Sequence, residues 1–198
     1  MGDKGSSGCG ALLAAIITAI ITALAAAYAK SPCGFYRTLN SALSKSGGHV
    51  DPPRKFVGTN VSFSNCSAAQ QASIKSWMKR GYDRLVADCW KNLIQPGVNA
   101  AEIKKIRNRI VDYLTCEPLK VICDPASCNE KEGRCAFVDP QRLWVKPKEL
   151  NVCPSKSNCS GDLTPALVHE IAHLAEFDVT GWSSNSSPIP SGFGSACS

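Results

Sequence analysis

Two stretches in the middle of the chain carry apolar residues at helical spacing. In residues 67–90 these are Ile74, Trp77, Met78, Leu85 and Cys89. Residues 99–116 repeat the pattern with Ile103, Ile106, Ile110 and Leu114. Each pattern predicts an amphipathic helix, with Ser67 as N-cap of the first and the "GVN" turn as the start signal of the second.

The pattern changes on either side of these helices. Between residues 117 and 153, short β-prone runs alternate with prolines, which predicts short strands and hairpins, some of them at a sheet edge. Residues 30–65 are expected to be loop-rich. "GDLTPALVHEIAHLAEF" is a further helix, with Thr164 as cap and Pro165 at its first position. The Gly/Ser/Pro-rich tail after Gly181 should be irregular, tethered by Cys197.

The N-terminus has the pattern of a targeting segment. Residues 11–29 are 19 consecutive residues without a charge, and they end in Ala27-Tyr28-Ala29, a small-x-small pattern for signal peptidase. We therefore expect a signal peptide at 1–29 and one domain at 30–198. The competing interpretation is a retained membrane anchor, since 19 apolar residues can span a bilayer.

The cysteines favour export. Removing residues 1–29 takes away Cys9 and leaves ten of the eleven cysteines, an even number, as a fully disulfide-bonded domain requires. No CxxC pair occurs in the sequence, which argues against a cysteine-type zinc site or a thioredoxin-like motif. Cys153 and Cys159 could close a small loop before the "HEIAH" helix. We expect an α+β fold, mainly helical with a small mixed sheet, stapled by disulfides.

Charge excludes one class of partner. The net charge is +6, but the basic residues are scattered along the chain and form no dense run. A nucleic-acid-binding protein would cluster Lys and Arg with aromatic residues on one face, so we expect no nucleic acid partner. The protein is expected to be a monomer, and a membrane is a partner only if residues 11–29 are retained.

The candidate metal-binding and catalytic residues lie in "VHEIAH", which holds two of the three histidines, four residues apart. On a helix, His169 and His173 share one face and can both bind one Zn²⁺. Glu170 can take a proton from the water that the metal activates and then protonate the leaving amine. This spacing is the signature of zinc metallopeptidases and predicts a zincin-like domain.

The third zinc ligand is less evident. His49, the remaining histidine, lies in "GGHVDPP", where we expect an exposed loop. Downstream of His173 the sequence has only two carboxylates, Glu176 and Asp178. Glu176 shares the helical stripe of the histidines, whereas Asp178 would point away unless the helix ends near Ala175. Both candidates remain open.

The segment "LWVKPKELNVCPSKSNCSGDLTPALVHEIAHLAEFD" resembles the deuterolysin-like metallopeptidases, the aspzincins. The "NCSAAQQASIKSWMKRGYDRLVADCW" stretch is similar to the opening helix of that family. The resemblance covers residues 62–182. It implies a secreted zinc endopeptidase with His169 and His173 as zinc ligands, Glu170 as the catalytic residue and Asp178 as the third ligand, with "FDVTGW" in place of the family's "DxxYG".

The chain departs from the family at this last motif. Asp178 follows His173 by only five residues, and Gly181 and Trp182 stand where the family has a tyrosine. The leading hypothesis is a secreted zinc endopeptidase acting on protein or peptide substrates by water attack. The alternative is a weakly active or inactive binding or toxin-like module on the same scaffold, possibly held at a membrane. Extracellular secretion is the expected location, with the periplasm or a membrane as alternatives.

Overall fold

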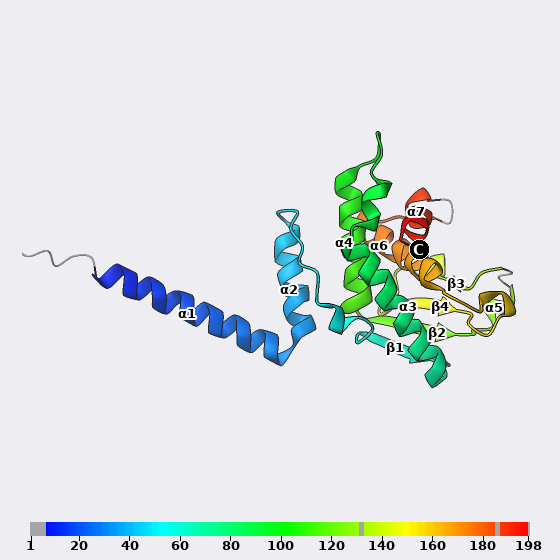
Figure 1. The fold of residues 1–198 in the computed structure, drawn as a ribbon, viewed down its shortest axis with the longest axis horizontal. Coiled ribbons are helices and arrows are strands. Elements are labelled where there is room, and N and C mark those ends of the chain that lie inside the picture. Colours follow the sequence, from blue (N-terminus) through cyan, green and yellow to red (C-terminus); the bar gives the residue numbers. More distant parts are fainter. Residues whose placement is uncertain (1–6, 131–132, 185–186, 198) are drawn as a thin grey trace, which may run out of the picture. The chain divides into compact units, whose positions relative to one another are not determined.

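The computed structural model describes residues 7–130, 133–184 and 187–197. The chain divides into two compact units, Met1–Gly48 and His49–Ser198. Figure 1 shows the elements of both units in chain order. The second unit contains the predicted zinc-binding helix and is considered in most detail below.

The first unit consists of two helices, α1 (Ser7–Lys30) and α2 (Pro32–Ser44). Leu12–Lys30 is long and apolar enough to cross a membrane, and it lies near the N-terminus. The side chain of Ser31 caps α2 by accepting a hydrogen bond from the backbone N–H of Gly34. The prediction of a loop-rich segment from residue 30 onward is therefore wrong for α2: its serine cap and Pro32 at the first position are helix start signals.

The second unit is built on a four-stranded sheet in the order β1-β2-β4-β3. Strands β1 (Val61–Ser64), β2 (Leu119–Cys123) and β4 (Lys148–Val152) are parallel, and only the short β3 (Ala136–Phe137) pairs antiparallel, at the edge. The predicted short strands and the edge strand are confirmed. Within residues 117–153, β2 and β4 are parallel and do not form a hairpin, because β3 and its flanking segments lie between them in the chain, whereas the consecutive strands β3 and β4 pair antiparallel.

Both predicted amphipathic helices are present, as α3 (Ala68–Val86) and α4 (Ala100–Thr115). Ser67 forms a capping box with Gln70, in which each side chain binds the other residue's backbone N–H. The Asn99 side chain accepts from the backbone N–H of Glu102 and caps α4. These start signals were readable from the sequence because a cap acts within three residues along the chain.

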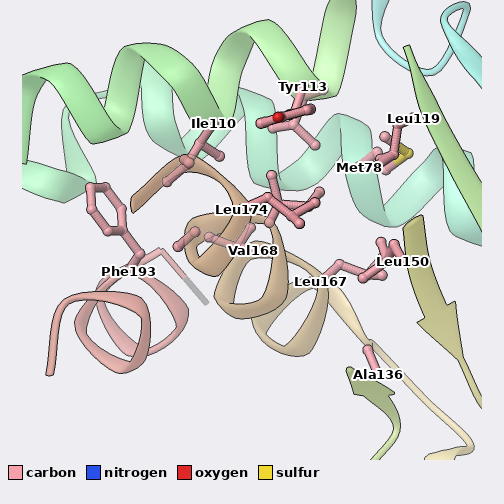
Figure 2. Packing of buried hydrophobic residues seen from close by; sticks show 14 of the residues in the cluster. Met78, Ile110, Tyr113, Leu119, Ala136, Leu150, Leu167, Val168, Leu174 and Phe193 are labelled. Atoms are coloured by element: carbon pink, nitrogen blue, oxygen red, sulfur yellow. The ribbon is translucent and has the colours of Figure 1, made fainter. Parts of the chain in front are cut away.

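Helix α6 (Thr164–Thr180) contacts α3, α4, α7, β3 and β4. Figure 2 shows Leu167, Val168 and Leu174 of α6 among Met78, Ile110, Tyr113, Leu150 and Phe193. Gly81 permits the close approach of α3, since a Cβ there would lie 2.8 Å from Val168 Cγ2. The helix that carries the HExxH sequence is therefore held on several sides by the main core.

The tail after α6 is not irregular as predicted: it forms α7 (Pro188–Ala196). Ser187 precedes the helix, Pro188 occupies its first turn, and Phe193 is fully buried in the core. These features are helix signals that the high Gly and Pro content obscured. The remaining helical segments are α5 (Ser127–Glu130) and the short 3₁₀ helices Arg54–Phe56, Cys89–Leu93, Pro140–Arg142 and Ser157–Cys159.

All ten cysteines after residue 29 are in disulfides, which confirms the inference from their even number. Within the second unit the pairs are Cys66–Cys123, Cys89–Cys197, Cys128–Cys153 and Cys135–Cys159. The expected Cys153–Cys159 loop is thus wrong, although Cys197 does tether the tail. The α+β, mainly helical, disulfide-stapled fold with a small mixed sheet is confirmed.

Candidate functional site

The site lies on α6, where the ring atoms His169 Nε2 and His173 Nε2 are 3.2 Å apart. The helix begins at Thr164, and Leu163 rather than Thr164 is its N-cap residue. The Asp162 carboxylate accepts a hydrogen bond from the backbone N–H of Thr164 at 2.9 Å. Asp162 therefore provides the capping interaction that the sequence predicted for Thr164. The two histidines project from one face because they are four residues apart.

Helix α7 packs beside the ring of His169. The Nε2 atom of that ring faces His173, and Nδ1 lies on the side of Gly194 of α7, where an added Cβ would be 3.5 Å from it. A Cβ at Gly194 would lie 3.0 Å from His169 Cβ and 3.2 Å from the Pro165 carbonyl oxygen.

The ring of His173 is held by a chain of hydrogen bonds that ends at a buried carboxylate. His173 Nδ1 lies 2.9 Å from Ser183 Oγ. The hydroxyls of Ser183 and Ser187 donate to the two carboxylate oxygens of Glu176, each at 2.5 Å. Glu176 is only 3% exposed. The structure therefore brings Glu176 close to the site, but joins it to His173 through a serine.

Glu170 is buried against the edge strand. Its Oε2 accepts from the backbone N–H of Val138 at 2.9 Å, directly after β3. Its Oε1 lies 3.8 Å from His169 Nε2. Burial raises the pKa of Glu170 to about 7, although the Val138 N–H and the charge of Arg134 act in the opposite direction. A carboxyl group with a pKa near neutrality can both accept and donate a proton at physiological pH.

Burial has the opposite effect on the histidines, because it disfavours their charged form. It lowers the pKa of His173 to about 4, assisted by His169 and Arg134, and it also lowers the pKa of His169. Both rings are therefore neutral at pH 7, which is the form that binds a metal.

Asp178 is directed away from the histidines. Helix α6 continues through it to Thr180, so the condition for an inward turn, an end near Ala175, is not met. Its carboxylate accepts from the Tyr113 hydroxyl at 2.6 Å and from Arg109 at 2.8 Å, and Lys148 Nζ lies 3.3 Å away. These partners lower the pKa of Asp178 against the effect of its burial. The structure thus engages Asp178 in an ion-pair cluster.

His49 is not an exposed loop histidine, contrary to the prediction. Its side chain is only 7% exposed, and Nε2 lies 3.2 Å from Asp51 and 3.8 Å from Asp112. Arg107 binds both oxygens of Asp51. The sequence could not reveal this arrangement, because Arg107 and Asp112 come from α4, more than fifty residues downstream.

The separation of the two histidine nitrogens fits a zinc ion. Two nitrogens at zinc-binding distance on a tetrahedral ion are about 3.3 Å apart, close to the observed 3.2 Å. Among the described residues, however, no group of three or more His, Cys, Asp or Glu side chains is arranged to hold a metal. The two histidines are therefore the side chains of the site that would hold such an ion.

Several residues of the site were missed at the sequence level. Ser183 and Ser187 follow α6, and Val138 follows β3. The helix signals at Ser187 and Pro188, with Ile189, Phe193 and Ala196 at helical spacing, could have revealed α7. The contact between Val138 and Glu170 has no local signal, since 32 residues separate them.

Comparison of the chain with protein families, with curated proteins and with solved structures finds no match in any of the three.

Proposed function

We propose that this protein is a zinc-dependent endopeptidase of zincin type, similar to the aspzincins. The observation that carries the proposal is the convergence of the Nε2 atoms of His169 and His173, 3.2 Å apart. The Oε1 atom of Glu170 lies 3.8 Å from one of them. Neutral rings with converging nitrogens, one of them held at its far nitrogen by Ser183, lie beside a buried carboxyl group, and this arrangement suits metal-assisted hydrolysis.

Each residue has a distinct role in this proposal. His169 and His173 would hold the zinc ion, which would supply a Lewis acid for water and for the substrate carbonyl. Glu170 accepts the proton of the attacking water and delivers it to the leaving amine. The raised pKa of Glu170, about 7, suits both transfers. No covalent bond between the protein and its peptide substrate is formed.

A second candidate function is a zincin-like binding module with weak or no turnover. The engagement of Asp178 by Arg109 and Tyr113 favours it, because the carboxylate that the family resemblance assigns to the metal is occupied elsewhere. With two protein ligands instead of three, the zinc ion would be held less tightly. The two candidates share the metal and differ in catalysis.

Export is part of the proposal. The apolar α1 helix is compatible with a signal sequence, and ten disulfide-bonded cysteines are typical of an extracellular protein. Cleavage after Ala29 would leave Ser31, the cap of α2, in the mature chain. Retention of α1 would instead hold the same domain at a membrane surface.

The test is to produce the full chain in a secretory host and to measure bound zinc and cleavage of an unfolded protein. We expect about one zinc per chain, loss of cleavage on chelation, and recovery when zinc is restored. Glu170→Gln should keep zinc and lose cleavage by at least about 100-fold, since it removes the proton acceptor. Glu102→Gln, the same change in the first turn of α4, is the matched control.

The outcomes separate the two candidates. A wild-type protein that binds zinc but cleaves no sequence in a broad peptide library is a binding module. A wild-type protein that binds no zinc at micromolar concentration contradicts both candidates. Full activity in Glu170→Gln would show that another group accepts the proton.

A further inference from the structure

Glu176 is a buried carboxylate that is joined to the site through serine hydroxyls. It lies on the same helix as the two histidines, three residues after His173. Within the described part of the chain, its hydrogen bonds come from serine hydroxyls and not from lysine or arginine. A buried negative charge with neutral partners is costly unless a positive charge lies nearby. The hydrogen-bonded chain from Glu176 leads to His173.

The direction of each hydrogen bond in this chain follows from its chemistry. A carboxylate can only accept, so the Ser183 hydroxyl donates its single proton to Glu176. The Ser183 oxygen is then left as an acceptor towards His173 Nδ1, 2.9 Å away. His173 Nδ1 therefore carries the proton, and in the neutral ring Nε2 carries a free lone pair.

The Nε2 atom of His169 lies 3.2 Å from Nε2 of His173. In the metal-free protein a proton on His169 Nε2 can occupy this gap as a hydrogen bond to the lone pair of His173. A divalent cation can take the place of that proton, because the link from Ser183 to His173 leaves the His173 Nε2 atom unprotonated.

We infer that Glu176 is a positioning residue, which acts through Ser183 to hold His173 in the tautomer that presents Nε2 to a divalent cation. The inference deepens the proposed function and rests on it for the identity of the cation as zinc. It replaces the view of Glu176 as a third ligand, since Ser183 lies between its carboxylate and the ring. The negative charge of Glu176 also offsets part of the charge of the ion.

Ser183→Ala and Glu176→Gln break this chain at successive links. Each should weaken zinc binding about 10- to 100-fold, the usual effect of removing an outer partner of a metal-binding histidine. The double variant should lose no more than the larger single loss, because both changes interrupt one chain. Ser187→Ala is the matched control: it removes the other hydroxyl from Glu176 but leaves the link to His173 intact, so it should weaken zinc binding less.

The measurement is zinc affinity by competition with a chromophoric chelator, on variants whose circular dichroism and thermal unfolding show that they fold. The inference would be overturned if the losses of zinc affinity added in the double variant and Glu176→Gln bound zinc far less tightly than Ser183→Ala. Glu176 would then be a direct ligand. Wild-type affinity in folded Ser183→Ala would also overturn it.

A second measurement does not depend on zinc. Long-range ¹⁵N–¹H NMR correlations report which ring nitrogen of His173 is protonated in the metal-free protein. At pH 7 we expect Nδ1–H in the wild type and a shift towards Nε2–H in Ser183→Ala. A protein that binds no zinc but shows this tautomer shift refutes the zinc proposal and supports the positioning role. An Nε2–H tautomer in the wild type refutes the positioning role.

Discussion

The carboxylate of Asp178 accepts a 2.6 Å hydrogen bond from the hydroxyl of Tyr113, on the side of α6 away from the histidines. Nine helical residues at about 100° each place Asp178 on the side roughly opposite His169. Arg109 and the buried Lys148 complete this ion-pair cluster. The same helical geometry that aligns His169 with His173 therefore excludes Asp178 from their stripe.

Asp178→Asn should lower stability without changing zinc affinity. It leaves the ammonium of Lys148, only 5% exposed, without its carboxylate partner, which costs about 3 kcal/mol. Urea unfolding and chelator competition measure the two effects. Asp83→Asn, which breaks the exposed pair with Arg54, is the matched control and should cost less than about 1 kcal/mol. A zinc affinity reduced with Asp178→Asn would instead support the family's ligand assignment.

The close packing of α7 against α6 predicts that alanine substitutions at two glycines of α7 affect stability to different extents. Gly194→Ala should destabilise the protein by about 1–3 kcal/mol and weaken zinc binding. The added methyl group meets His169 Cβ at 3.0 Å and the Pro165 carbonyl oxygen at 3.2 Å, and neither can move freely.

Gly192→Ala is the control for this change in the same helix. Its methyl group meets the end of the Leu93 side chain, which can rotate away, so stability should change less than in Gly194→Ala. Thermal unfolding and zinc competition on both variants test the difference. Equal effects of the two substitutions would mean that α7 does not restrain His169.

The Asp51 carboxylate predicts a loss of stability in acid. Burial opposes its ionisation, but the nearby His49 ring and the hydrogen-bonded Arg107 guanidinium lower the pKa of Asp51 to about 2, against an ordinary 3.8. The folded state therefore binds this proton less readily than the unfolded state, and the contribution is present above about pH 4.

As pH falls from about 4 to about 2, roughly 2 kcal/mol of stability should be lost through Asp51. Urea unfolding at a series of pH values measures this slope in the wild type. The slope should be shallower in Asp51→Asn, which cannot ionise. An unchanged slope would show that Asp51 has the same pKa in both states.

The N-terminal segment predicts a defined end of the mature chain. If signal peptidase cleaves after Ala29, the exported protein begins at Lys30, and Edman degradation reads "KSPCGFYRT". Changing Ala29 to a bulky residue should then block processing and leave the protein attached to the membrane. An intact N-terminus on the wild-type protein in the membrane fraction would identify α1 as an anchor.

The sequence alone determined the features that act over a few residues. The caps at Ser67 and Asn99, the periodicity of α3 and α4, and the shared face of His169 and His173 all depend on neighbours within one or two helical turns. The even number of cysteines correctly indicated full disulfide bonding, but their pairing required the fold, because ten cysteines allow very many connectivities.

Tertiary structure decided what each polar group of the site contacts. Helical geometry favoured Glu176 and the family resemblance favoured Asp178 as a ligand, and their environments differ because α6 runs on to Thr180. That extra turn directs Asp178 to Arg109 of α4 and leaves Glu176 facing the serines before α7. Hydrogen bonds between segments far apart in the chain have no local pattern, so only the folded packing could reveal them.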